Sequence, residues 1–513
     1  MKIRYKSLLC LAVTINILLL SSPLKCLADP IAELHQSVET AKRLRENNQS
    51  SQAISMLQAA IKRLPSEDFD SVELANAYCE LAKEFREADR APEALDAEET
   101  AIRVVEKNWQ NKPTERSIDD DETRGLESPA ASDRLKGHVI CTGAAGLLSS
   151  DGIFSSSPVQ IEDMFKKLEQ TQDRWIADGH CNTRNILLYA HGGLVSEKSG
   201  LRDADSHLDW WMNNGIYPVS FVWQSGIREL IRFKKERKKG TRDLDDEGDS
   251  RGILLPATLV DEAARRIMKP LWVEMKNTAI GASAPITAAL DWGHPEAISS
   301  QQPGASLLVD RLKQYVAAHP DVRVHLMCHS AGSIFCIGLL ERLHEAGIKV
   351  ATITYLAPAM RVSDFRSYVL PRIKQGQIGQ IAIYNLDERL EQNDISMIKG
   401  IGYKGSILCL VSHCMEEPEL GETLEEVPLL GMSKFLHKPI FVLSRSELAD
   451  VIKENNGTIV ISNGRDPNSS ATAHSGFADD QATLVSATER ILGKAQGSMS
   501  KPTAGSLGVG NSR

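Results

Sequence analysis

One stretch of the 513-residue sequence decides its fold class: Val322-Arg323-Val324-His325-Leu326-Met327-Cys328-His329-Ser330-Ala331-Gly332-Ser333-Ile334-Phe335. Its first part is apolar and partly β-branched, which predicts a strand. Its last part carries apolar residues at helical spacing, which predicts a helix. Small residues join the two. A strand that turns directly into a helix is typical of a sheet covered by helices.

Six further strand-like runs alternate with helical segments along the chain. Such alternation predicts an α/β fold in which helices flank a mostly parallel sheet. The seven predicted strands are His138–Cys141, Asn185–Ala190, Pro218–Trp223, Val322–Met327, Ala351–Leu356, Gln380–Leu386 and Gly457–Ser462.

Ser330 stands in the turn between the predicted strand and helix. The sequence Cys328-His329-Ser330-Ala331-Gly332 has the G-x-S-x-G pattern of a nucleophile elbow, with Cys in place of the first Gly. Such a turn holds its serine in a strained backbone conformation above the sheet, and the dipole of the next helix favours negative charge there. The alternative is a serine that only caps the helix.

A second turn, His191-Gly192-Gly193-Leu194, follows the earlier strand that ends at Ala190. Acyl transfer needs backbone N–H groups aimed at the tetrahedral oxyanion, and glycines let the chain bend so that those groups face the serine. Gly193 or Leu194 would supply one donor of this oxyanion hole, and Ala331 the other. The alternative is that the two glycines only form a structural turn.

The order of these elements resembles the α/β-hydrolase superfamily, in particular its serine esterases and lipases, over residues 138–495. The resemblance implies a catalytic acid and then a histidine further along the chain. Asp387 lies just beyond a predicted strand, where the family places its acid, so we assign it that role. Asp394 is the alternative acid, and Glu388 and Glu391 stand near enough to compete.

His474 is the predicted base. It follows the last predicted strand in a loop before a helix, as the family's catalytic histidine does. His413 is the alternative base, although its apolar surroundings favour a structural role. His329 is the direct neighbour of the nucleophile and His191 belongs to the glycine turn, so we assign the base to neither.

The resemblance implies hydrolysis of a small-molecule or lipid carboxylic ester through an acyl-enzyme. His474 would remove the Ser330 proton, Ser330 would attack the acyl carbonyl, and water would release the acyl group. This chemistry needs no metal and no organic cofactor, and no cysteine spacing is typical of a metal site. Two alternatives remain: an amidase or peptidase with the same residues, and an inactive hydrolase fold that acts as an interaction protein.

Residues 1–28 have the layout of a secretory signal peptide. A basic start precedes an apolar run from Leu8 to Leu20, and small residues end at Ala28. A membrane span needs about 20 apolar residues, so we expect cleavage after Ala28 and a secreted or periplasmic protein. An uncleaved anchor is the alternative. Cleavage would change the net charge from −9 to −13, and this acidic balance disfavours a nucleic-acid partner.

Residues 29–110 are expected to be helical, because apolar residues recur at helical spacing. Gln52-Ala53-Ile54 has a counterpart in Glu93-Ala94-Leu95, an internal echo that resembles tetratricopeptide-type helical hairpins. Such a module would bind a protein partner, whereas the alternative is a plain four-helix appendage. Residues 111–137 are predicted to be a linker, and residues 496–513 a disordered tail.

Residues 224–304 form an insertion far longer than the ~2–6 residues of a usual connection between strand and helix. A basic run at 232–239 precedes an acidic one, and residues 259–282 have the pattern of an amphipathic helix that Pro270 should kink or divide. We interpret the insertion as a lid over Ser330, with a solvated surface insertion as the alternative. The basic run suits peripheral contact with anionic lipid headgroups.

Overall fold

The computed structural model divides into two compact units, residues 1–111 and 112–513. The described residues are 29–65, 71–111, 133–149, 152–193, 195–223, 231–233, 257–286, 289–398, 401–419, 426–437 and 447–494. The predicted signal peptide, most of the predicted linker and the predicted tail lie outside these ranges, as do Leu194 and most of both charged runs of the insertion.

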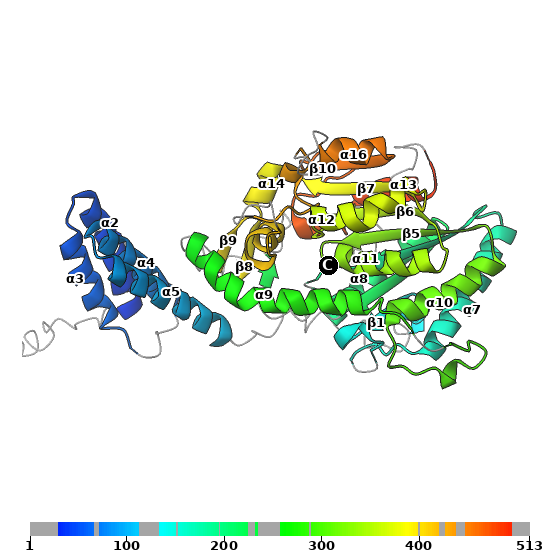
Figure 1. The fold of residues 1–513 in the computed structure, drawn as a ribbon, viewed down its shortest axis with the longest axis horizontal. Helices are drawn as coiled ribbons and strands as arrows, with labels where there is room; N and C mark the ends of the chain where they lie inside the picture. Colours follow the sequence, from blue (N-terminus) through cyan, green and yellow to red (C-terminus); the bar gives the residue numbers. More distant parts are fainter. Residues whose placement is uncertain are drawn as a thin grey trace, which may run out of the picture. The chain divides into compact units, whose positions relative to one another are not determined.

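The N-terminal unit consists of helices, as predicted (blue in Figure 1). They are α2 (Pro30–Glu46), α3 (Ser50–Ile61), α4 (Val72–Glu87) and α5 (Ala91–Asn111). Asp29 and Ser71 cap α2 and α4, because their side-chain oxygens accept hydrogen bonds from first-turn amides. The predicted apolar positions Leu34, Val38 and Ala41 are buried.

A buried ion pair ties the two helical hairpins of this unit together. Arg45 of α2 lies 2.8 Å from Glu80 and 3.2 Å from Glu84, both on α4. Glu80 and Glu84 are almost fully buried, and a buried carboxylate is costly unless it is paired. The pair therefore fixes which faces of the hairpins meet.

The second unit is built on a seven-stranded parallel sheet in the order β1-β3-β2-β5-β6-β7-β10. All seven predicted strands are present in it. Their bounds are β1 Val139–Thr142, β2 Arg184–Ala190, β3 Ile216–Trp223, β5 Val322–His329, β6 Val350–Leu356, β7 Ile378–Leu386 and β10 Gly457–Ser462. The sequence prediction of an α/β fold with a mostly parallel sheet is confirmed.

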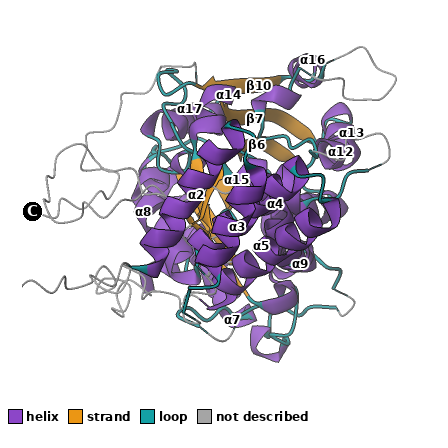
Figure 2. Cartoon of the chain, turned by 90° about the vertical axis from the view of Figure 1, so that its left-hand side faces the viewer, coloured by secondary structure: helices purple, strands orange, loops and turns teal. Residues whose placement is uncertain are grey.

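Helices cover both faces of this sheet (Figure 2). They include α7 (Pro158–Ala177), α8 (Glu197–Asn213), α10 (Gly304–Ala318), α11 (Gly332–Glu345) and α17 (Gln481–Ile491). The chain moves across the sheet in one direction from β2 to β3 and in the other from β5 to β6, so right-handed crossovers place α8 and α11 on opposite faces. α17 packs beside α8, where the Trp210 indole donates to the Thr488 hydroxyl at 3.0 Å.

Shorter elements complete the second unit. A three-stranded antiparallel sheet joins β4 (Ile231–Phe233), β8 (Ile395–Ile398) and β9 (Ile401–Lys404). The remaining described helices are η4 Ala144–Gly146, η5 Pro295–Ala297, α12 Val362–Asp364, η6 Phe365–Val369, α13 Leu370–Lys374, α14 Glu388–Asn393, α15 Ile407–Leu410, η7 Val411–Met415, η8 Ser433–Phe435, α16 Leu448–Glu454 and η9 His474–Gly476.

The described part of the insertion is dominated by one helix, α9 (Ala257–Gly281), with Pro270 inside it. Of the two predicted effects of Pro270, a kink or a division into two helices, the division does not occur, because one helix continues through the proline. Glu416, which is buried, accepts hydrogen bonds from Trp272 at 2.6 Å and Lys276 at 2.8 Å and so anchors α9 to the body of the unit. No described helix is long and apolar enough to cross a membrane.

The end of the predicted linker belongs to the folded second unit. Leu135 is buried in an apolar cluster with Val139, Phe154 and Val222. An exposed linker would leave this side chain in water, and its burial contributes roughly 1.5–3 kcal/mol. Leu135 thus packs with the core of the second unit.

Candidate active site

The order of the strands creates a crevice between β2 and β5. Chain direction across the sheet reverses there, and parallel strands leave a gap beyond their carboxyl ends at such a reversal. The His191-Gly192-Gly193 turn follows β2, and Ser330 follows β5. The topology therefore brings the two motifs found in the sequence to the same edge of the sheet.

Ser330 lies in a strained turn between β5 and α11. Its φ is +51°, a left-handed conformation that costs a non-glycine residue about 1–3 kcal/mol. Its amide donates to the Leu356 carbonyl at 2.9 Å, and its carbonyl accepts from the Ala359 amide at 3.0 Å. These bonds hold the serine in place from the neighbouring β6 side.

A disulfide bond spans this turn. It was not predicted from the sequence. It joins Cys328, at the end of β5, to Cys336, in α11. Both residues are buried. The remaining cysteines of the described chain, Cys79, Cys141, Cys181, Cys409 and Cys414, are free. A cysteine on each side of one tight strand-to-helix turn is the signal that would have suggested the pairing.

His474 meets Ser330 as predicted. Its Nε2 lies 2.9 Å from the Ser330 Oγ, although the two residues are 144 positions apart. The backbone of His474 is held on both sides: its amide donates to Asp394 Oδ2 at 3.0 Å, and its carbonyl accepts from His329 Nε2 at 3.1 Å. The loop is therefore fixed before any substrate arrives.

Both histidines beside Ser330 favour the neutral form. Burial lowers the pKa of His474 well below 6.5, and the nearby His329 lowers it further. Burial lowers the pKa of His329 in the same way. A neutral imidazole has one nitrogen that accepts, and in the tautomer with the proton on Nδ1 the His474 Nε2 can take the proton of the hydroxyl that it faces.

Asp387, which we assigned as the acid from the sequence, is the N-cap of α14. Its carboxylate caps α14 by accepting from the Leu390 amide at 2.7 Å and lies 3.7 Å from Arg389. The extended ψ of 158° at Asp387 turns the side chain back onto the helix that follows. The alternative, Asp394, instead contacts the His474 backbone. Geometry therefore favours Asp394 over Asp387.

The ring nitrogen of His474 that points away from Ser330, Nδ1, is buried and makes no hydrogen bond to any residue that the structure describes. In a Ser-His-acid triad the acid holds this nitrogen and stabilises the imidazolium. Asp394 is the carboxylate that already touches His474, so it is the group best placed to take that role.

The other residues that the sequence suggested as base or acid make structural contacts. His413 Nδ1 donates to the Cys409 carbonyl at 2.7 Å, and its Nε2 lies 3.6 Å from Glu426. No described contact joins His413 to Ser330. Glu391 is buried against the Ser406 hydroxyl, and burial raises its pKa to about 7.

The glycine turn is packed so tightly against the elbow that side chains are excluded. A Cβ on Gly193 would lie 2.8 Å from the Ala331 Cβ and would clash with the Met275 sulfur of α9. A Cβ on Gly332 would clash with the Ala190 carbonyl oxygen. The Ala331 amide precedes the first residue of α11 and belongs to the unpaired donors of a helix start. Gly192 and Gly193 thus lie directly against Ser330 and Ala331.

Hydrogen bonds of His191 hold the conformation of this turn. Its Nε2 accepts from the Trp223 amide at 3.2 Å, so its Nδ1 carries the proton and donates to the Gly192 carbonyl at 2.7 Å. The Trp223 indole returns a hydrogen bond to the His191 carbonyl at 3.0 Å. The sequence assignment of His191 to the loop, and not to the base, agrees with these contacts.

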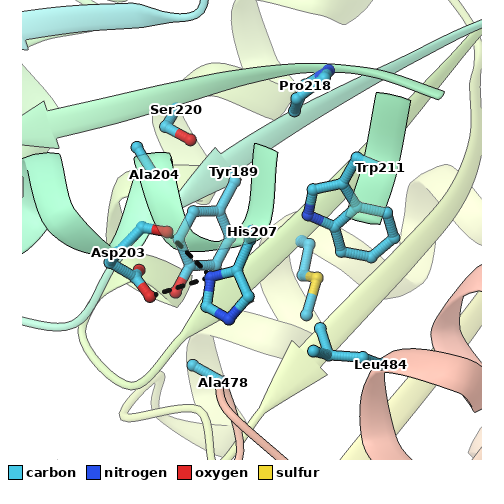
Figure 3. A pocket seen from close by; sticks show the side chains of 10 residues that line it. Tyr189, Asp203, Ala204, His207, Trp211, Pro218, Ser220, Ala478 and Leu484 are labelled. Carbon is cyan, nitrogen blue, oxygen red and sulfur yellow. Dashed lines mark hydrogen bonds and ion pairs between the residues drawn. The ribbon is translucent and has the colours of Figure 1, made fainter. Parts of the chain in front are cut away.

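A pocket with a volume of about 250 Å³ lies over Ser330 and His474. This volume is slightly below the roughly 300–1,000 Å³ of most ligand pockets. Its lining includes Tyr189, Asp203 and Asp479, and no lysine or arginine among the described residues. Tyr189 and Asp203 also line a narrower neighbouring pocket, which His207 and Trp211 enter from α8 (Figure 3).

No family model and no curated protein matches the chain. Among solved structures, an uncharacterized protein from Bacillus cereus matches at 12% sequence identity and a TM-score of 0.17. The match covers 69% of this chain and 83% of that chain. The chemistry of the site therefore has to be inferred from its own residues.

Proposed function

We propose that this protein is a serine hydrolase of the α/β-hydrolase type that cleaves carboxylic esters. The observation that carries the proposal is the 2.9 Å distance between the Ser330 Oγ and the His474 Nε2, beyond the carboxyl ends of a parallel sheet. A hydroxyl is a weak nucleophile until a neighbouring base removes its proton. Here the base is neutral and faces the hydroxyl.

Ser330 would attack the acyl carbonyl while His474 takes its proton. The tetrahedral oxyanion would then lie between the Ala331 amide and the glycine turn, and α11 would favour its charge. His474 would return the proton to the leaving alcohol and afterwards activate water. No step calls for a metal or an organic cofactor.

The α9 helix supports the glycine turn. Met275 of α9 lies against Gly193, so this helix packs directly on the proposed oxyanion turn. The Glu416 contacts with Trp272 and Lys276 hold α9 there. No α9 residue is among the described residues that line the pocket over Ser330, so a lid function stays a proposal for the rest of the insertion.

Labelling by a fluorophosphonate probe tests the proposal. The wild-type protein should be labelled, and Ser330→Ala should abolish labelling and ester turnover. His474→Ala should slow both by at least ~10²-fold, the usual size of a general-base effect. Ser55→Ala is the matched control, because Ser55 is exposed in the N-terminal unit, and it should react like wild type.

Undiminished labelling of folded Ser330→Ala would exclude Ser330 as the nucleophile. A series of p-nitrophenyl esters of increasing acyl length, compared with peptide p-nitroanilides, separates the esterase proposal from amidase or peptidase activity.

A further inference from the structure

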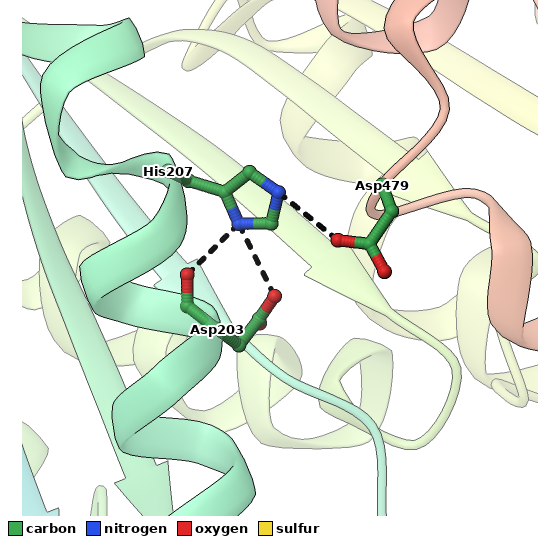
Figure 4. Close-up of side chains that lie close together, drawn as sticks. All are labelled: Asp203, His207 and Asp479. Carbon is green, nitrogen blue, oxygen red and sulfur yellow. Dashed lines mark hydrogen bonds and ion pairs between the residues drawn. The ribbon is translucent and has the colours of Figure 1, made fainter. Parts of the chain in front are cut away.

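Asp203, His207 and Asp479 form a cluster that the serine chemistry does not use. Asp203 and His207 lie one turn apart on α8, and the Asp203 Oδ1 is 3.1 Å from the His207 Nδ1. On the other side of the ring, Nε2 is 3.3 Å from the Asp479 Oδ1. Figure 4 shows the imidazole between the two carboxylates. We call this arrangement the His207 bridge.

Both nitrogens of His207 face groups that can only accept hydrogen bonds. Nδ1 also lies 2.9 Å from the Asp203 carbonyl oxygen. Acceptors on both sides require a proton on each nitrogen, so the ring is an imidazolium. Burial lowers its pKa, but the bonds to Asp203 and Asp479 outweigh burial and raise the pKa to about 10.

The His207 bridge joins two sides of the pocket. α8 begins shortly after the His191-Gly192-Gly193 turn, whereas Asp479 lies on the segment that starts with His474. The start of this segment is held by Asp394 and His329, and its end by Asp480, which caps α17 through the Thr483 amide at 2.9 Å. Between these two held ends, the ion pair of Asp479 with His207 links the segment to α8.

We infer that the His207 bridge positions the catalytic histidine, by fastening the 474–479 segment to the helix that follows the oxyanion turn. This inference rests on the proposed function, because it makes His207 and Asp479 positioning residues for His474. A displacement of about 1 Å at a reacting group can cost ~10²-fold in rate. An ion-paired bridge across the pocket limits such movement.

A divalent metal is the alternative occupant of this cluster, because one ligand atom from each of the three residues lies within 4.8 Å of the others. Each His207 nitrogen, however, faces a different carboxylate, at 3.1 and 3.3 Å. This arrangement favours a charged ring that pairs with both aspartates over an ion held by a single nitrogen.

His207→Gln and Asp479→Asn test the inference. Each removes the charge of one partner at similar size, and Asp479→Asn alters a side chain that is 78% exposed, so it should fold. We expect kcat for a p-nitrophenyl ester to fall about tenfold in each variant with KM little changed, because positioning acts on the reacting atoms. The double variant should lose no more than either single one, because the partners act together.

Matched controls repeat the two substitutions away from the pocket. His294→Gln changes an exposed histidine 3.5 Å from Glu296, and Asp163→Asn changes an exposed aspartate paired with Lys166. Both should keep wild-type kcat. An unchanged kcat in folded His207→Gln and Asp479→Asn would overturn the inference. So would a rise in KM alone, which would make these residues substrate contacts.

Hydrogen–deuterium exchange provides a readout that does not need activity. Peptides covering residues 474–480 should exchange faster in His207→Gln than in wild type, and Ser330→Ala should leave their protection unchanged. Equal protection in His207→Gln would contradict the bridge even if the protein had no esterase activity. Zn²⁺-dependent stabilisation that is lost in His207→Gln would also overturn the inference, in favour of a metal site.

Discussion

The backbones of Ser330 and His474 are fixed before their side chains meet. The Ser330 amide bonds to the last residue of β6 and its carbonyl to Ala359, just beyond that strand, and the His474 amide and carbonyl bond to Asp394 and His329. Loop residues held on both sides lose little freedom when the substrate binds. The 2.9 Å contact between Oγ and Nε2 is therefore preorganised.

The lowered pKa of His474 sets the pH dependence. A general base acts only when it is unprotonated, so activity is lost as the pH falls through its pKa. Because burial and His329 hold that pKa well below 6.5, the acid limb of kcat/KM should lie below pH 6.5. A profile of kcat/KM against pH, with a substrate that does not titrate, measures it. An acid limb at or above pH 6.5 would contradict this assignment.

Asp394 and Asp387 are distinguished by paired substitutions. Asp394→Ala should lower kcat by roughly 10²–10⁴-fold, because the carboxylate beside His474 is lost. Asp387→Ala should keep kcat near wild type but cost about 1 kcal/mol of stability, because it removes the cap of α14. Ester turnover and urea unfolding of both variants provide the measurements, and the reverse pattern would restore Asp387 as the acid.

At the scale of elements, the junction of β5 and α11 contains a strained residue and is cross-linked by a disulfide. Ser330 occupies a left-handed conformation, while Gly332 allows α11 to approach the Ala190 carbonyl. The Cys328–Cys336 disulfide spans the same junction. Such a bond also fits an oxidising compartment, which agrees with the proposed secreted or periplasmic location.

Removing the disulfide should destabilise the second unit. For a loop this short the loss of chain constraint is worth about 2–3 kcal/mol. Cys328→Ala with Cys336→Ala should therefore shift the urea midpoint downward, whereas Cys181→Ala, at a partly exposed free thiol, should not. Detection of free Cys328 and Cys336 thiols in oxidised native protein by alkylation and mass spectrometry would contradict the pairing.

At the scale of the whole molecule, the residues of the candidate active site and the N-terminal helices belong to different units. Every residue that we place at the site belongs to the second unit, 112–513. The N-terminal helices have their own core and their own buried ion pair. From the sequence echo that resembles tetratricopeptide hairpins, we propose that these helices bind a protein partner, separately from the proposed hydrolysis.

A chain that lacks residues 29–111 should therefore keep its reactivity. We expect fluorophosphonate labelling and ester kcat within about twofold of the full chain, since no site residue is removed and most distant changes are nearly additive. Circular dichroism would show whether the shortened chain is folded. A folded but unreactive chain would show that the helical unit contributes to the site.

Local sequence patterns predicted the strands of the large sheet and the positions of Ser330 and His474. Period-two and apolar runs located all seven strands of the large sheet, and the change from strand pattern to helix pattern located the turn that holds Ser330. The motif order also selected His474 from 13 histidines. These features are readable because each depends on neighbouring residues: strand propensity, turn chemistry and helix capping all act over a few positions.

Only the tertiary structure decided which distant groups meet. Asp387 and Asp394 both follow β7, and the choice between them depends on which carboxylate faces a loop 80 positions away. The Cys328–Cys336 bond spans only eight positions, so the sequence did offer a local signal for it. The His207 bridge, in contrast, depends on side-chain direction and on the packing of α8 against the His474 segment. Such contacts are set by long-range packing, because burial and geometry across elements select them and no local pattern encodes them.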